Sequence, residues 1–230
     1  MTKSELYFPQ ELSIIKKTKV NGCSLMQYLK DEVKNSILQA ALSEFMRHGY
    51  SNASMRQIAN LAGITPGNIY RYFKNKEDLF QELIHPVYEK FIQYLMEIKD
   101  DFDDSYCVIN TTNPLDYLRK VESTIVELFK ESNVELRILL NLSSGSSYEP
   151  VKQELIQLAA HILMKVFIPG EDQQDQAMIE ERNLAHMLAG TLIEGVCIIL
   201  RDHEDGETVR QLVDELLRVY CAGIISRLNI

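Results

Sequence analysis

The apolar residues between positions 31 and 80 recur every three or four positions, and glycine or proline interrupts this spacing at short intervals. The first segment places its apolar side chains on one face of a helix, at Val33, Ile37, Leu38, Ala41, Leu42 and Phe45. Gly49 suits the left-handed residue that follows a helix, and Tyr50 supplies the apolar contact that accompanies it. The pattern predicts short helices, each ending at a defined residue.

Two short helices are predicted next. Ser54 followed by Gln57 has the spacing of a capping box, so a helix of about two turns begins there and breaks at Gly63. Thr65 suits the N-cap of the following helix, and Pro66 suits its first position, where no N–H is needed. Side chains expected in or beside the core of this domain are Ile69, Tyr72 and Phe73.

A longer helix follows, and its start is well marked. Asn75 is the expected N-cap, and Glu77 and Asp78 are favourable near the positive end of the helix dipole. This helix is predicted to reach about Lys99, with a kink or a break at Pro86.

The rest of the chain is also predicted to be helical. Residues 100–114 are polar and are interpreted as a boundary. Further helices are expected near 114–131, 133–142, 150–167, 174–202 and 206–228, and no segment alternates like a strand. The fold class is therefore all-α, with an extension of uncertain order at 1–30, a three-helix domain at 31–80 and a second helical domain at 81–230.

Two short helices joined at Gly63 form a helix-turn-helix, whose second helix enters the DNA major groove with its N-terminal residues first. A glycine inside this helix costs roughly 0.5–1 kcal/mol relative to alanine, but Gly67 lets the backbone approach DNA closely. An ordinary helical hairpin of an all-α protein is the alternative interpretation. The predicted DNA-binding residues are Ser54, Arg56, Thr65, Gly67, Asn68, Tyr70, Arg71, Lys74 and Lys76.

Charge is distributed unevenly along a chain whose net charge is −9. Residues 1–98 contain 12 Lys and Arg against 10 Asp and Glu, whereas residues 99–230 contain 12 against 23. An acidic second half can serve solubility alone. It also allows a near-neutral first part to approach a polyanion, and charge does not decide between these interpretations.

Residues 37–80 resemble the N-terminal domain of the TetR family of bacterial transcription regulators. The matching positions are Ile37, Ala40, Ala41, Phe45, Gly49, Tyr50, Ile58, Ala59, Ala62, Gly63, Tyr70, Phe73, Lys76, Leu79 and Phe80. The resemblance implies a C-terminal domain that binds a small-molecule effector and forms a homodimer. The N-terminal extension is longer than is usual in this family.

The last two predicted helices, near 174–202 and 206–228, are the expected dimer interface. Their candidates for close helix packing are Leu184, Leu188, Gly190, Thr191, Gly195, Leu212, Leu216, Val219 and Gly223, although the core of a monomer is an alternative use for them. Candidates for an effector pocket are Tyr94, Tyr117, His161, Met164 and His186, although ordinary packing or a surface position is the favoured explanation for each of them.

Catalysis is not expected. The five histidines show no paired-ligand spacing, the serines at 143–147 lack the flanks of a nucleophile elbow, and 203–207 reads as a solvated loop. No metal and no cofactor is predicted. No apolar run approaches the ~20 residues of a membrane span, and the four separated cysteines suit a reducing compartment, so a cytoplasmic protein is expected.

The sequence thus predicts a homodimeric, ligand-responsive repressor that binds a near-palindromic DNA operator. The rival hypothesis is a helical protein-interaction module in which the helix-turn-helix face contacts another protein.

Overall fold

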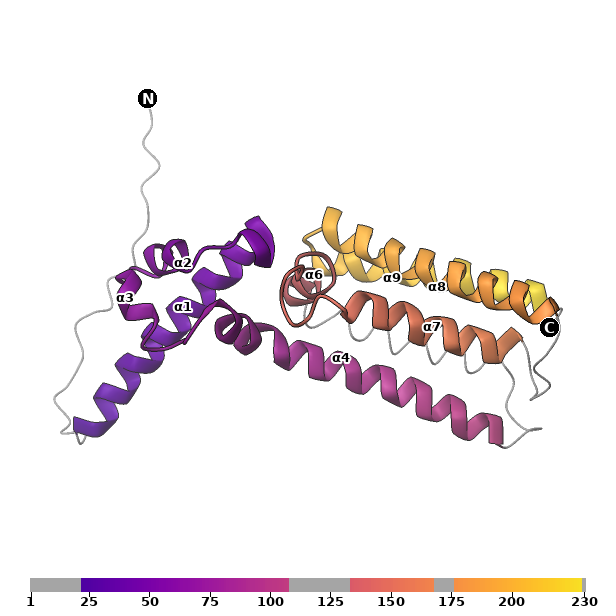
Figure 1. Cartoon of the computed structure of the whole chain (residues 1–230), viewed down its shortest axis with the longest axis horizontal. Coiled ribbons are helices and arrows are strands. Elements are labelled where there is room, and N and C mark those ends of the chain that lie inside the picture. Colours follow the sequence, from indigo (N-terminus) through magenta and orange to yellow (C-terminus); the bar gives the residue numbers. More distant parts are fainter. Residues whose placement is uncertain (1–21, 108–132, 168–175, 229–230) are drawn as a thin grey trace, which may run out of the picture.

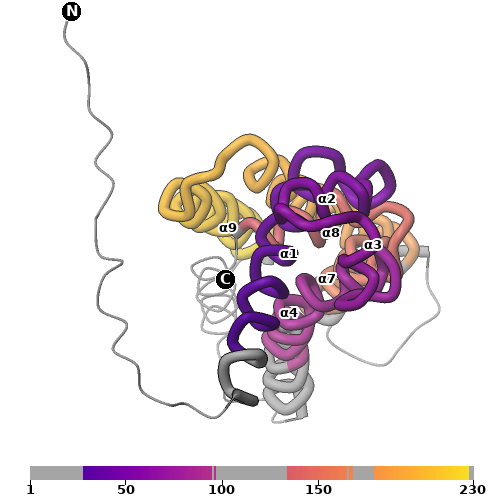
Figure 2. Tube along the Cα trace, turned by 90° about the vertical axis from the view of Figure 1, so that its left-hand side faces the viewer, coloured from indigo at the N-terminus to yellow at the C-terminus, as the bar shows by residue number. Residues whose placement is uncertain are grey.

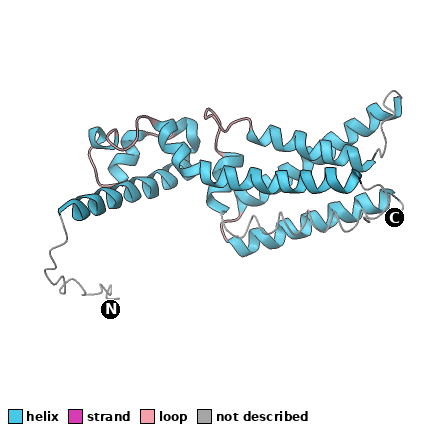
Figure 3. Ribbon diagram, turned by 90° about the horizontal axis from the view of Figure 1, so that it is seen from below, coloured by secondary structure: helices cyan, strands magenta, loops and turns pink. Residues whose placement is uncertain are grey.

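The computed structural model describes residues 22–107, 133–167 and 176–228, and within these ranges every regular element is a helix (Figure 3). The all-α prediction is confirmed. The helix predicted near 114–131 and residues 1–21 lie outside the described residues. The helices are α1 (Gly22–Asn52), α2 (Met55–Leu61), α3 (Pro66–Ile69), α4 (Lys76–Cys107), α6 (Asn133–Asn141), α7 (Val151–Phe167), α8 (Gln176–Asp202) and α9 (Gly206–Leu228).

Helices α1, α2 and α3 form the N-terminal body at one end of the molecule, and α4 leads from it along the C-terminal helices (Figure 1). Helix α1 begins at Gly22, earlier than the predicted residue 31, so part of the predicted extension is helical. Gly49 has the predicted positive φ, 69°, and interrupts the helical dihedrals. Tyr50 then packs beside Phe45 and against Phe80, with ring centroids 6.1 and 4.8 Å away.

Helix α4 begins as predicted, because the Asp78 N–H donates a 2.8 Å hydrogen bond to the Asn75 side chain. It then continues through Pro86 to Cys107. The boundary predicted from residue 100 is therefore wrong for 100–107. That stretch is polar, but it contains no glycine or proline, and polarity alone does not end a helix.

The C-terminal helices α7, α8 and α9 lie side by side, with α8 contacting both neighbours (Figures 1 and 2). Gly195 confirms the prediction of close packing, because a Cβ there would lie 2.9 Å from Leu216 Cδ2. The Tyr220 hydroxyl also donates a 2.7 Å hydrogen bond to Thr191 Oγ1. Glycine and paired polar groups thus hold α8 against α9.

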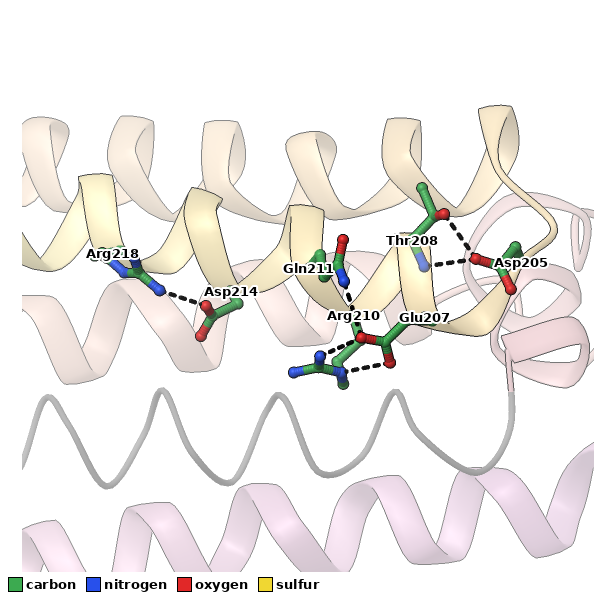
Figure 4. A network of polar contacts seen from close by, with 7 residues as sticks. All are labelled: Asp205, Glu207, Thr208, Arg210, Gln211, Asp214 and Arg218. Atoms are coloured by element: carbon green, nitrogen blue, oxygen red, sulfur yellow. Dashed lines mark hydrogen bonds and ion pairs between the residues drawn. The ribbon is translucent and has the colours of Figure 1, made fainter.

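A polar network fixes the start of α9 (Figure 4). The N–H and the hydroxyl of Thr208 donate to one carboxylate oxygen of Asp205, at 2.9 and 2.7 Å. These hydrogen bonds hold the pKa of Asp205 below its ordinary value. The Asp205 carboxylate is therefore engaged as a helix cap, and the predicted solvated loop at 203–207 is present for 203–205, since α9 begins at Gly206.

Residues Ile179–Asp202 of α8 are long and apolar enough to cross a membrane by length and composition. The expectation that no apolar run approaches this length is wrong for α8. A core helix of a soluble helical domain passes the same test, and α8 packs between α7 and α9.

Candidate nucleic-acid interface

The turn between α2 and α3 is built on one glycine and two buried anchors. Gly63 has a φ of 70°, and the following Ile64 N–H donates a 3.0 Å hydrogen bond to the Ala59 carbonyl. Ile58 of α2 and Ile69 of α3 are fully buried in the same core. These contacts fix α3 against α2 and leave its opposite face outward.

Most of the predicted DNA-binding residues are exposed on α2, on α3 or in the segment that follows α3. Arg56 lies on α2, Gly67 on α3, and Arg71 and Lys74 follow α3, and all four are exposed. A Cβ added to Gly67 would meet no atom within 4 Å, so the protein itself does not cover this point. Asn68 is half-buried, and the other predicted residues that are exposed are Ser54, Thr65 and Tyr70.

Helix α3 is a single turn of four residues. It ends at Ile69. A tight turn follows, in which the N–H groups of Arg71 and Tyr72 donate hydrogen bonds to the carbonyls of Asn68 and Ile69. Tyr70 and Arg71 therefore occupy the turn after the helix. Burial of Phe73 holds that turn against the core and keeps Tyr70, which is 54% exposed, on the outside.

The predicted capping box at the start of α2 does not form. Ser54 occupies the N-cap position, but its side chain makes no capping hydrogen bond. Its N–H donates instead to the buried carboxylate of Glu44, at 3.1 Å. Glu44 projects from the buried face of α1 and takes the role expected of Gln57. A carboxylate on an otherwise apolar helix face was the available sequence signal.

Thr65 and Pro66 behave differently from each other at the start of α3. Thr65 has the extended backbone of an N-cap, but its hydroxyl makes no capping hydrogen bond. Pro66 occupies the first turn, as predicted. Like that of Ser54, the Thr65 hydroxyl is exposed and is not engaged in a helix cap.

Lys76 is placed differently from the other predicted DNA-binding residues. Its ammonium donates hydrogen bonds to the carbonyls of Tyr50, Ser51 and Ala53, at 2.6, 3.1 and 3.2 Å. It also lies 4.4 Å from the centre of the Tyr50 ring. Burial lowers the pKa of Lys76, and the nearby Glu77 carboxylate opposes this effect. The ammonium binds the end of α1, so we assign Lys76 a structural role in place of the predicted phosphate contact.

Substitutions of Lys76 and Lys74 distinguish a structural lysine from one that contacts DNA phosphate. We expect Lys76→Met to lower the free energy of unfolding by about 1–3 kcal/mol, because carbonyls lose their donors. Lys74→Ala should leave stability unchanged and reduce the slope of DNA affinity against salt by about 1. Urea unfolding and DNA titration at several salt concentrations measure both effects. If Lys76→Met instead leaves stability unchanged and reduces the salt slope, Lys76 contacts a DNA phosphate, as the sequence predicted.

No effector site emerges from the predicted pocket residues. Tyr94 and Met164 are half-buried, His161 and His186 are exposed, and Tyr117 lies outside the described residues. An open hollow of about 440 Å³ lies on the N-terminal body, lined by Asn35, Ser36, Gln39, Ala40, Leu61 and Ala62. Within the described ranges, His, Cys, Asp and Glu form no group of three suited to a metal ion.

Comparison with known proteins identifies the N-terminal body. Residues 37–83 match the model of the bacterial regulatory proteins of the tetR family. An HTH-type transcriptional regulator of Staphylococcus aureus strain USA300 is 33% identical over 109 residues, which are 46% of this chain and 58% of the relative. A homologous regulator of the bovine strain RF122 is 34% identical over 113 residues. The match thus spans little more than half the length of these curated relatives.

A solved structure resembles the whole fold. A TetR-like transcriptional regulator from Rhodococcus sp. RHA1 superposes with a TM-score of 0.52 at 20% identity, covering 83% of this chain and 96% of that one. The fold and the interface define a helix-turn-helix protein with a C-terminal helical domain. Residues 37–83 thus match the tetR family of bacterial regulatory proteins, and the whole fold resembles that of a TetR-like regulator.

Proposed function

We propose that this protein is a sequence-specific DNA-binding transcriptional regulator. The observation that carries the proposal is the open approach to Gly67, at the leading end of a short helix whose other face is buried. Backbone and small side chains at this end can reach base edges in the major groove. Arg56, Arg71 and Lys74 surround it with positive charge that suits DNA phosphates.

The regulator acts as a homodimer through α8 and α9. These helices expose large apolar side chains, including Met187 at 54% and Val219 at 68%. Gly223 on α9 is exposed, and a Cβ there would meet nothing within 4 Å, so a second helix has room to approach closely. A twofold dimer places two recognition helices about 34–36 Å apart, one turn of DNA.

The regulator is a cytoplasmic repressor that an effector releases from DNA. A small molecule bound in the C-terminal domain shifts α4, whose first turn contacts the N-terminal body, and the recognition helices then no longer match the half-sites. Nearly complete release requires the effector to favour the free form by several kcal/mol, about 5.5 for a shift from 1:99 to 99:1.

Asn68 is expected to read bases. Because an asparagine amide pairs bidentately with adenine, Asn68→Ala should cost about 1–3 kcal/mol at one base pair and relax the preference there. Affinities for a set of DNA fragments substituted at each position measure the change. A uniform loss over all fragments would instead assign Asn68 to the phosphate backbone.

The proposed function is tested by mixing the purified protein with fragmented DNA from its own genome and sequencing what it retains. Recovery of fragments that share a near-palindrome supports a dimeric regulator. A folded protein that retains no DNA at low salt, and yields no bound small molecule in mass spectrometry, would favour the protein-interaction module.

A further inference from the structure

The loop between α6 and α7 reaches across to the N-terminal body. It follows α6 at Leu142 and ends at Pro150, and it packs on the α1–α2 turn, residues 49–54. The Tyr50 N–H donates a 2.8 Å hydrogen bond to the Leu142 carbonyl, and the Ser51 hydroxyl donates to the Ser144 carbonyl. The two domains are therefore joined by direct hydrogen bonds as well as by α4.

Glu77, in the first turn of α4, receives hydrogen bonds from both domains. The N–H and the hydroxyl of Ser147 donate to one of its carboxylate oxygens, at 3.1 and 2.5 Å. The Tyr50 hydroxyl also donates a hydrogen bond to this carboxylate. Burial, as the larger cause, and this hydrogen bond raise the pKa of Tyr50 to about 12. Glu77 thus connects the α6–α7 loop of the C-terminal domain with the end of α1.

The fit between loop and turn is close. Gly145 has a φ of 86°, and a Cβ there would lie 2.6 Å from the Ser51 hydroxyl oxygen. Beneath the polar contacts, the Tyr148 ring packs 6.0 Å from Phe80 and 5.2 Å from Tyr88. Both rings belong to α4, so the loop is seated on apolar side chains and does not rest on hydrogen bonds alone.

We propose that Glu77 and residues 142–148 form an interdomain latch that sets the position of α2 and α3 relative to the C-terminal domain. The latch holds the α1–α2 turn, which ends at Ser54, and α2 with the predicted DNA contact Arg56 follows directly. The consequence for DNA binding rests on the proposed function, whereas the latch itself is a property of the free protein. Ser147 and Glu77 are positioning residues, because neither lies among the predicted DNA contacts.

The hydrogen bonds of the latch favour the ionised form of Glu77. Burial acts to raise its pKa, but hydrogen bonds from Ser147, Tyr50 and Gln81 together hold the pKa below the ordinary 4.5. Other titratable groups that act on or near this carboxylate are Lys76 and Tyr148. Since the folded pKa is the lower one, the stabilisation is present above about pH 4.5 and is lost as pH falls through the folded pKa.

Hydrogen–deuterium exchange of the full-length free protein tests the latch. Glu77→Gln should increase exchange several-fold in residues 49–54 and 142–148. Asp78→Asn is the matched control, because it removes the same charge from the same helix turn without touching the loop. Ser147→Ala is a milder variant that should shift exchange in the same direction. Unchanged exchange in Glu77→Gln, or an equal increase in both charge variants, would overturn the latch.

DNA affinity supplies the second readout. We expect Glu77→Gln to bind DNA about 10-fold more weakly than Asp78→Asn. Faster exchange with unchanged affinity would overturn the claim that the latch positions the helix-turn-helix. If the wild-type protein binds no DNA, the proposed function fails, and the exchange result alone then supports or overturns the latch.

Discussion

Gly67→Glu is expected to abolish specific DNA binding and leave the protein folded. Nothing in the protein lies within 4 Å of a Cβ at this position, so a longer side chain fits the free protein. On DNA the same side chain would hold the α3 backbone away from the groove and place a negative charge among phosphates. The expected loss is at least about 100-fold, equivalent to about 2.8 kcal/mol.

Gly67→Ala is the matched control for that substitution. It should stabilise the protein slightly, since alanine in a helix is favoured over glycine by roughly 0.5–1 kcal/mol. Its DNA affinity should fall less than that of Gly67→Glu, because only one methyl group is added. Circular dichroism and fluorescence anisotropy with labelled DNA measure folding and affinity. Full affinity in the glutamate variant would contradict the placement of α3 in the major groove.

Val219→Glu is expected to convert the proposed homodimer into monomers. Val219 is the most exposed large apolar side chain among the described residues, at 68%, and it faces outward from α9. A twofold interface would bring its copy into the same contact region and bury an unpaired carboxylate twice, which costs several kcal/mol. Sedimentation velocity should show the monomer mass, and DNA affinity should fall because the half-sites are no longer bound together.

Gln157→Glu adds the same charge at an exposed position of α7, outside the two helices of the proposed interface. It should leave the dimer intact and exclude a general effect of added charge. If Val219→Glu remains dimeric at micromolar concentration, the dimer interface lies on another surface of the protein.

The turns, helix caps and buried helix faces that are set by residues close together in the sequence could be predicted. Gly49, Gly63, Pro66 and Asn75 each determine local backbone or capping geometry, and the structure has them in those roles. The buried side chains Ile69 and Phe73 followed from helical spacing in the same way. The fold class and the resemblance to TetR-family regulators followed from these residues.

The contacts that escaped prediction join residues far apart in the chain. Lys76 caps the end of α1 from 23 to 26 positions away, and Glu77 accepts from Ser147 at a separation of 70. Glu44 displaced Gln57 because tertiary packing brought a carboxylate to the Ser54 N–H. Each of these polar residues has an acceptable local role, as a surface charge or a dipole partner, so local pattern gives no reason to assign a distant one.

The most direct test of the account is a comparison of two affinities. The affinity of the wild-type protein for the recovered near-palindromic fragment is measured beside its affinity for a scrambled fragment of equal composition, at about 150 mM salt. The account predicts a preference of at least about 1,000-fold for the recovered fragment. Equal affinities for the two fragments would contradict sequence-specific regulation and leave only charge-driven binding.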